Sequence, residues 1–250
     1  MGSSRFPGKS LQPILGKPAL ELLLERLCRA ETVEEVVLAT TTRPEDDAIE
    51  ALCRRLALKC FRGSSEDVLE RVARAAAWAK ADVIVEITGD CPLTCPEVVD
   101  AAVRRFLAGD IDYLSNLLVQ TYPQAVDVRV FRAADLQEIN ERLAGHDAAA
   151  REHVSLYFEE HPERYRTHVM EAPPQYHRPG WRLDLDYPED LVLLTKIFEA
   201  LYPKNPVFSL QELIEFLDSH QELQSINAHM VRKPLRPAAG CGAPAQAMRK

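Results

Sequence analysis

The chain has 250 residues, 38 acidic and 30 basic side chains, and a formal net charge of −8. Its hydrophobic content of 46% and charged content of 27% are ordinary for a soluble globular protein. The acidic balance argues against a nucleic-acid binder, and no apolar run is long enough to span a membrane. We therefore expect one large domain over residues 1–232, located in the cytoplasm, with neither nucleic acid nor membrane as a partner.

Strands and helices alternate along the first half of the chain. Pro residues open the helices predicted at 18–30, 44–56 and 96–107, and Ser64 or Ser65 is expected to cap the helix predicted at 64–79. Short apolar runs predict strands at 36–39, 59–61 and 82–87 and around Tyr113, with 82–87 buried on both faces. This order predicts an α/β fold, a doubly wound and mostly parallel sheet.

The second half of the chain is less regular. Residues 126–131 alternate like a half-exposed strand, and apolar periodicity predicts helices at 133–143, 148–160, 188–201 and 210–219. Residues 165–170 and 181–185 are expected to add antiparallel strands to the sheet. Residues 233–250 are rich in Pro, Ala and Gly, which predicts a disordered tail.

The six cysteines lie mostly inside predicted helices or strands, so reduced thiols are expected. Cys91 and Cys95 have no second cysteine pair that would complete a zinc site.

The first eighteen residues combine small residues with cations and contain no acid. Backbone N–H groups of a small-residue loop bind anions, and lysine and arginine neutralise phosphate, so the segment predicts a nucleotide triphosphate site. It is not a P-loop, because five residues instead of four separate Gly2 from the Gly8-Lys-Ser segment. A flexible terminus with incidental charge is the alternative.

Two acidic segments follow predicted strands. Asp90 follows 82–87, at the end of a strand where open α/β sheets bind ligands, which suits a metal carboxylate; a turn residue that caps backbone N–H groups is the commoner alternative. Asp184 and Asp186 are two residues apart, so on a strand they face one side and can share a cation. Capping of the helix at Pro188 is the alternative for Asp186.

Several blocks resemble one enzyme family in its own order. Besides the N-terminal loop they lie at 39–47, 61–64, 87–93, 151–154 and 185–191, and together they span residues 1–231. They are similar to the cytidylyltransferases that activate acidic sugars, especially the branch of spore coat polysaccharide biosynthesis protein SpsF, related to CMP-sialic acid and CMP-Kdo synthetases. The resemblance implies the Rossmann-like fold of nucleotide-diphospho-sugar transferases and a homodimer.

The resemblance also implies roles for individual residues. Asp90 and Asp186 would hold Mg²⁺, and Arg5 and Lys9 would act in catalysis by neutralising the triphosphate and the departing pyrophosphate. The nucleotide would be bound by Gly2, Ser3, Ser4, Arg5, Lys9 and Asp90. The acceptor, an acidic or amino sugar, would be bound by Ser115, Asn116, Asp127, Arg151, Glu152 and His153.

The predicted reaction is transfer of CMP from CTP to a sugar hydroxyl, with release of pyrophosphate, for surface polysaccharide or glycan synthesis. Family members carry an apolar strand and an Ala-Arg pair before the Gly-Ser-Ser segment, so we expect a sheet without its first strand and a natural start upstream of Met1. The alternatives are a glycosyltransferase that uses Asp184 and Asp186, or a non-catalytic nucleotide- or sugar-binding protein.

Overall fold

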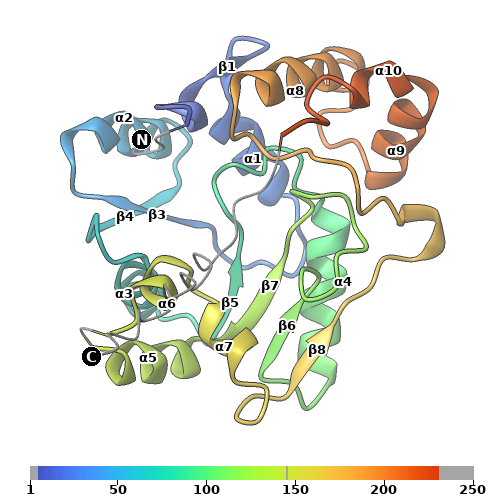
Figure 1. The fold of residues 1–250 in the computed structure, drawn as a ribbon. Helices are drawn as coiled ribbons and strands as arrows, with labels where there is room; N and C mark the ends of the chain where they lie inside the picture. The colour runs from blue at the N-terminus through green and yellow to red at the C-terminus, as the bar shows by residue number, and fades with distance from the viewer. Residues whose placement is uncertain (1–4, 145, 231–250) are drawn as a thin grey trace, which may run out of the picture.

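The computed structural model describes residues 5–144 and 146–230, and within them a four-stranded mixed sheet forms the centre of an α/β fold (Figure 1). Its order is β5 (Val83–Glu86), β7 (Arg129–Arg132), β6 (Tyr113–Ser115), β8 (Thr167–Val169). Strand β7 runs antiparallel to both β5 and β6, whereas β6 and β8 are parallel. Strands β5 and β6 therefore end at the same edge of the sheet, and β7 begins there.

The two faces of this sheet carry separate cores, because successive side chains of a strand point to opposite sides. Leu114 and Val130 belong to the larger core together with α4 (Pro96–Ala108). Tyr113 and Phe131 belong to the smaller core, which also contains residues of α7 (Leu156–Glu160). Helices α4 and α7 thus cover opposite faces of the sheet.

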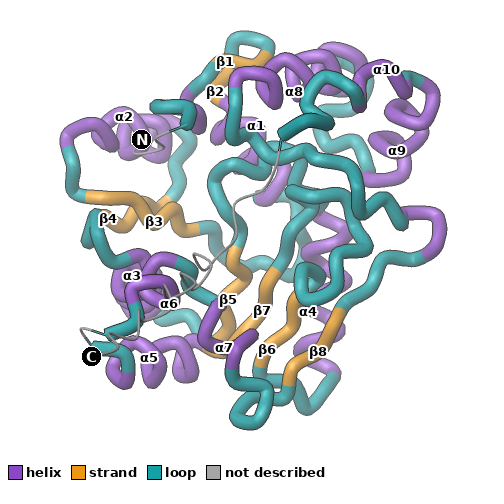
Figure 2. The backbone as a smooth tube through the Cα atoms, viewed as in Figure 1, coloured by secondary structure: helices purple, strands orange, loops and turns teal. Residues whose placement is uncertain are grey.

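A parallel pair of strands, β3 (Val37–Thr41) and β4 (Lys59–Gly63), forms a separate sheet (Figure 2). The 3₁₀ helix η2 (Pro44–Asp46) and helix α2 (Asp47–Arg55) connect them, and α3 (Val68–Ala79) follows β4. Ile49 and Leu52, which lie on the apolar face of the predicted helix, are among the buried side chains of α2.

The N-terminal segment and the C-terminal helices lie together at the top of Figure 1. The segment consists of η1 (Lys9–Leu11), the hairpin β1 (Pro13–Ile14) and β2 (Lys17–Pro18), and α1 (Ala19–Leu27). Leu15 and Gly16 have φ angles of 52° and 76°, the left-handed conformation of a two-residue hairpin turn. The later elements are η3 (Pro174–Tyr176), α8 (Pro188–Leu201), α9 (Leu210–Ser219) and α10 (Gln221–Gln224), and α8 contacts β1.

The predicted helices at 133–143, 188–201 and 210–219 are confirmed, the first as α5 (Ala133–Arg142). The predicted single helix at 148–160 is wrong, because the chain breaks into α6 (Ala148–Glu152) and α7. The N-cap of α3 is Asp67, whose side chain accepts from the Glu70 N–H, and not Ser64 or Ser65.

Four predictions about strands are also wrong. Strand β8 pairs with β6 in parallel and not antiparallel. Residues 181–185 form no strand and contribute one isolated parallel bridge, between Gln124 and Arg182. Residues 126–131 are buried throughout and not half-exposed, since both faces of the sheet are covered at this strand. Strand β5, predicted to be buried on both faces, is only half-buried.

Among the described residues, Cys28, Cys53, Cys60, Cys91 and Cys95 are free thiols. No helix in the described ranges is both long and apolar enough to cross a bilayer. The predicted tail at 233–250 lies outside the described residues.

Candidate active site

Lys9 joins two aspartates that are far apart in the sequence. Its Nζ donates to Asp90 Oδ2 at 2.8 Å and to Asp186 Oδ1 at 2.7 Å. Asp90 lies in the loop after β5, and Asp186 lies in the loop before α8. The two loops are also tied together directly, because the Leu185 N–H donates to the Asp90 carbonyl oxygen at 2.8 Å. The convergence expected from the sequence is therefore present.

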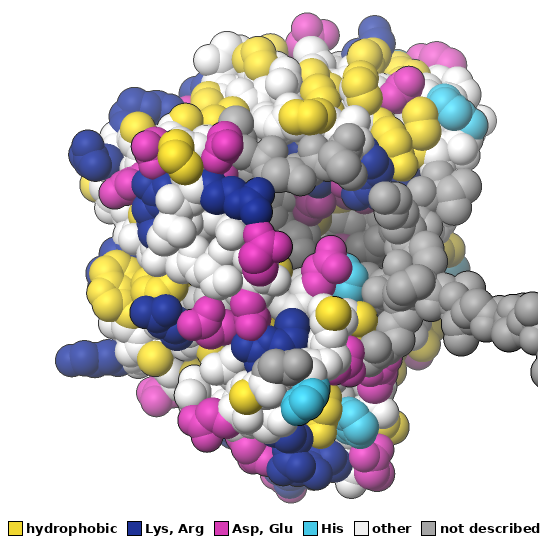
Figure 3. All heavy atoms as spheres, turned by 60° about the vertical axis from the view of Figure 1, so that its left-hand side comes forward, with side chains coloured by type: hydrophobic (Ala, Val, Ile, Leu, Met, Phe, Trp, Pro, Cys, Tyr) yellow, Lys and Arg dark blue, Asp and Glu magenta, His cyan; other side chains and the backbone are white. Residues whose placement is uncertain are grey.

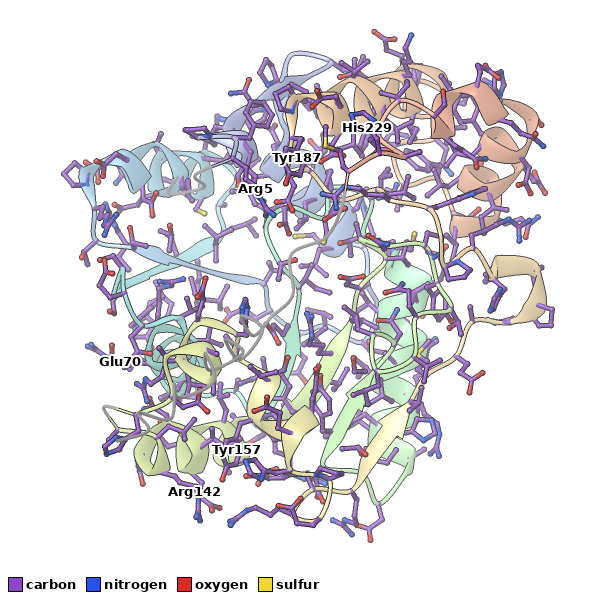
Figure 4. All side chains as sticks on the ribbon, in the orientation of Figure 1. Arg5, Glu70, Arg142, Tyr157, Tyr187 and His229 are labelled. Carbon is purple, nitrogen blue, oxygen red and sulfur yellow. The ribbon has the colours of Figure 1, made fainter. Side chains whose placement is uncertain are left out.

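Arg5 adds a second cation on the same carboxylate. Its guanidinium lies 2.7 Å from Asp186 Oδ2, and its Cζ lies 5.3 Å from the centre of the Tyr187 ring. Figure 4 shows Arg5 and Tyr187 near one another, between the N-terminal segment and α8. Lys9 and Arg5 thus contact different carboxylate oxygens of Asp186, an arrangement that fixes its rotamer.

A third cation approaches Asp186 from the protein interior. The Arg182 Nη2 is 3.2 Å from Asp184 Oδ2 and 3.3 Å from Asp186 Oδ2, and Arg182 Nε is 3.3 Å from Asp190 Oδ1. All four of these side chains are buried. One guanidinium therefore holds three carboxylates that would otherwise repel each other in a poorly solvated place.

Asp190 anchors the backbone of the same loop. Its Oδ2 accepts the N–H groups of Asp186 and Tyr187, each at 2.8 Å, and its Oδ1 accepts from Asn227 at 2.8 Å. Tyr187, and not Asp186, is the N-cap residue of α8. Sequence reasoning missed Arg182 and Asp190, although their spacing of four residues on either side of Asp186 was visible.

The charges in this cluster shift several pKa values. Burial lowers the pKa of Lys9, but Asp90 and Asp186 outweigh burial and raise it above its ordinary value. For Asp90, burial is outweighed by Lys9, and the pKa is lowered. Burial, assisted by the other aspartates, raises the pKa of Asp184 to about 6 despite Arg182. Lys9 is therefore firmly cationic, and Asp184 holds its charge weakly.

The donor set suits a magnesium ion that is shared with a substrate. No cluster of three or more His, Cys, Asp or Glu side chains able to hold a metal was found in residues 5–144 and 146–230. Mg²⁺, however, commonly takes one or two carboxylates and completes its shell with water and phosphate oxygens. Asp90 and Asp186 converge on one nitrogen, and beside them Asp184 Oδ1 is buried without a hydrogen-bond partner among the described residues.

The loop predicted to bind the nucleotide is described only in part. Gly2, Ser3 and Ser4 lie outside the described residues. Arg5, Lys9 and Asp90 are brought together with Asp186. Figure 3 shows that acidic and basic side chains are interleaved on the face carrying α2 and α3, without a separate basic field.

The predicted acceptor residues on the sheet have structural contacts. Asn116 donates to the Val126 carbonyl at 2.6 Å and accepts from the Val128 N–H at 2.9 Å. The Ser115 hydroxyl accepts from the Leu117 N–H at 3.0 Å, and the Asp127 carboxylate accepts from the Ala125 N–H at 3.1 Å. These side chains shape the edge of the sheet, and their role in binding a sugar stays a prediction.

The Arg151-Glu-His triplet does not form one unit. Arg151 points away toward α3 and α5, where its Nε donates to Asp67 at 2.6 Å and its Nη2 donates to Asn140 at 2.9 Å. Glu152 is exposed, and His153 is half-buried in the link between α6 and α7. These contacts show that Arg151 links α3 to α5, and the predicted roles of Arg151, Glu152 and His153 in binding the acceptor all stay predictions.

Comparisons with known proteins show a family and a fold that this chain resembles. Residues 1–223 match the family described as cytidylyltransferase. Spore coat polysaccharide biosynthesis protein SpsF of Bacillus subtilis (strain 168) is 33% identical over 229 residues, which cover 89% of this chain and 92% of that protein. A solved cytidylyltransferase from Leptospira borgpetersenii serovar Hardjo-bovis (strain JB197) has a TM-score of 0.83 at 30% identity, covering 94% of this chain and 95% of that one.

A more distant structure shares the fold. CMP:2-keto-3-deoxy-manno-octonic acid synthetase, solved in complex with CTP, has a TM-score of 0.58 at 19% identity and covers 79% of this chain and 94% of its own. The Rossmann-like α/β fold of nucleotidyltransferases is thereby shown for this chain.

Proposed function

Because the chain belongs to the cytidylyltransferase family, we propose that it transfers CMP from CTP to a sugar hydroxyl and releases pyrophosphate. The observation that carries the proposal is the convergence of Lys9 with Asp90 and Asp186, within hydrogen-bond distance of a single nitrogen. Family membership makes the chain a nucleotidyltransferase and not the glycosyltransferase considered above.

The cations do most of the work that the reaction requires. Phosphoryl transfer depends on positioning and on stabilising charge, so a nucleophilic residue on the protein is not needed. Lys9 and Arg5 bring two positive charges to the place where the triphosphate would lie, and both stabilise the negative charge that grows on the departing pyrophosphate. Arg182 holds the Asp186 carboxylate through an ion pair, and Asp190 holds its backbone by accepting the Asp186 N–H.

Asp90 and Asp186 are the residues that would hold Mg²⁺. When bound, the ion supplies Lewis-acid charge on phosphate oxygens and orients the triphosphate. The buried, unmatched Asp184 Oδ1 supports this assignment, because a cation nearby would offset its burial.

The acceptor and the assembly are finer proposals. The names of the relatives support sugar activation: SpsF acts in spore coat polysaccharide biosynthesis, and several relatives are 3-deoxy-manno-octulosonate cytidylyltransferases. We extend from these an acidic or amino sugar as acceptor and a surface polysaccharide or glycan as the destination. A homodimer, which the resemblance implies, and a cytoplasmic location, which the composition favours, are part of the same proposal.

A pyrophosphate-release assay tests the proposal. The protein is incubated with CTP, Mg²⁺ and a panel of 2-keto sugar acids and amino sugars, with ATP, GTP and UTP in parallel. We expect release with CTP and at least one sugar. No release with any nucleotide and sugar, from protein that is folded by circular dichroism, would contradict it.

Two lysine variants make the assay specific. Lys9→Met is expected to lower kcat by about 10²–10³-fold, because it removes a preorganised charge from the developing pyrophosphate. Lys17→Met is the control, since Lys17 pairs with Glu25 and Tyr202 away from the aspartates. Equal losses in the two variants would contradict a catalytic role for Lys9.

A further inference from the structure

A charged cluster lies on the face of the central sheet that α7 covers. Glu86 of β5 is directly opposite Arg129 of β7, which is in turn opposite Ser115 of β6. Two residues further into the sheet, the same face carries the aromatic core around Tyr113 and Phe131. Glu86 and Arg129 therefore stand at the boundary between this core and the edge of the sheet.

The surrounding side chains hold the cluster from α7. Tyr113 donates its hydroxyl hydrogen to Glu159 Oε1 at 2.7 Å. Arg129 Nε is 4.0 Å from the same oxygen, which is an ion-pair distance too long for a hydrogen bond. Burial raises the pKa of Glu86, and Ser155, the N-cap residue of α7, is among the neighbours that oppose this shift. Tyr113 and Arg129, from two neighbouring strands, thus both interact with Glu159 of α7.

Two atoms of the cluster are left unmatched. Arg129 Nε, a donor, and Glu86 Oε2, an acceptor, are both buried and have no hydrogen-bond partner among the described residues. Unmatched buried polar atoms are rare and unfavourable. A donor and an acceptor on directly opposed residues would be expected to bond each other if their role were to hold the two strands together, and they do not.

The cluster lies at the same edge as the candidate active site. Glu86 ends β5, and Asp90 follows it four residues later. Asp127 links the two regions electrostatically, because it acts on Arg129 on one side and on Cys91, next to Asp90, on the other. A molecule whose hydroxyl approaches a nucleotide held at Asp90 has this edge of the sheet beside it.

We propose that Glu86 and Arg129 bind hydroxyl groups of the acceptor sugar, an inference that rests on the proposed function. A sugar hydroxyl both donates and accepts, so adjacent hydroxyls can give a hydrogen to Glu86 Oε2 and receive one from Arg129 Nε. Glu86 and Glu159 together offset the guanidinium charge, so the pair recognises the uncharged polyol part of the sugar and not a carboxylate.

The pair is close enough to the surface for this role. The Arg129 side chain is 10% exposed and that of Glu159 is 19% exposed, while Glu86 and His153 are half-buried. The backbone of the two strands is held by ladder hydrogen bonds, so binding requires the Glu86 and Arg129 side chains to turn and not the strands to move.

Acceptor binding to the CTP-bound protein is the direct test, measured by saturation-transfer NMR with a non-hydrolysable CTP analogue. Three proteins are compared: the natural chain, Glu86→Gln with Arg129→Lys, and the control Tyr165→Phe. Tyr165 lies in the same core, and its buried hydroxyl is likewise without a partner among the described residues, but it is not at the edge of the sheet.

We expect the double variant to bind the acceptor at least tenfold more weakly while its affinity for CTP, measured by calorimetry, changes less than twofold. Deoxy analogues of the acceptor should lose affinity in the natural protein but lose little more in the double variant. Unchanged acceptor binding, or an equal loss for Tyr165→Phe, would overturn the inference. The inference would also be overturned if the double variant lost affinity only for acceptors that carry a carboxylate.

The two proposals fail in different ways. If the natural protein binds CTP and sugar but releases no pyrophosphate, the proposed reaction fails while the binding comparison still decides the role of Glu86 and Arg129. If pyrophosphate is released and the double variant has the natural KM for the sugar, only the present inference fails.

Discussion

Replacing Arg182 by methionine tests how much this buried guanidinium stabilises the three aspartates of the candidate site. Arg182 is buried and contacts three buried carboxylates, those of Asp184, Asp186 and Asp190. Methionine preserves most of the volume but removes the charge and every hydrogen bond. The variant therefore leaves three carboxylates close together with no guanidinium between them.

The expected loss can be worked from these contacts. Removing one partner of a buried ion pair costs about 3–5 kcal/mol, because the remaining charge is left without compensation. Lys9 and Arg5 still contact Asp186, and Asn227 still contacts Asp190, so we expect the lower half of that range. For a domain of this size each kcal/mol corresponds to roughly 2–4 °C in Tm, which predicts a fall of about 6–16 °C.

The loss should depend on pH in a defined direction. Burial already raises the pKa of Asp184 in the folded state, and without the guanidinium, which lowers it, that pKa rises further above its unfolded value. Stability from groups shifted upward is present at low pH and is lost as the pH rises through the folded-state values. The deficit of Arg182→Met should therefore be larger at pH 8 than at pH 5. Thermal and urea unfolding in the presence of EDTA, at pH 5 and at pH 8, measure this loss of stability.

Arg178→Met is the matched control. Arg178 pairs with Asp218 on the surface, where its side chain is 28% exposed, so its loss should cost at most about 1 kcal/mol. Equal destabilisation of the two variants, or a deficit for Arg182→Met that does not shrink at pH 5, would refute the reasoning.

Three further predictions concern single groups. Burial raises the pKa of Asp184 to about 6 from an ordinary 3.8, so its ionised form destabilises the folded protein. Asp184→Asn should therefore be as stable as the natural protein at pH 4 and more stable by up to roughly 3 kcal/mol at pH 8, measured by urea titration with EDTA. No gain in stability at pH 8 would contradict this prediction. Asp46 accepts hydrogen bonds from the Thr41 N–H and hydroxyl. Burial would raise the pKa of Asp46, but these hydrogen bonds outweigh burial and lower it. Asp46→Ala should therefore reduce the free energy of unfolding by about 2–3 kcal/mol at pH 7, and by less as the pH falls below 4. Arg151→Met should lower Tm while the KM for the acceptor sugar stays within twofold, because Arg151 holds Asp67. A change confined to that KM would instead support the predicted role of Arg151 in binding the acceptor.

The chemistry of the site could be read from the sequence because its residues come in short blocks. Lys9, Asp90 and Asp186 each follow or precede a recognisable element, and loops at one edge of an open α/β sheet meet. Resemblance then indicated which of many aspartates to choose. The same blocks also attracted attention to Arg151, whose contacts lie elsewhere, because a residue within a block can serve packing as well as binding.

The elements least well predicted were those whose form depends on distant partners. The break between α6 and α7 places Glu159 of α7 where its carboxylate accepts from the Tyr113 hydroxyl, on a strand more than forty residues earlier. Strand β8 is three residues long, and its direction is decided by pairing with β6. Neither contact leaves a local pattern of hydrophobic residues that a reader of the sequence could count.

By itself, the sequence determined the alternation of elements, the cationic N-terminal segment and the aspartates that end up together, because periodicity and loop chemistry are local properties. Only the tertiary structure decided that Arg182 lies under three carboxylates and that Glu86 and Arg129 stand opposite each other with unmatched atoms. The physical reason is that charge compensation and hydrogen-bond matching in a buried place depend on which groups lie within a few ångströms, and folding alone brings those groups together.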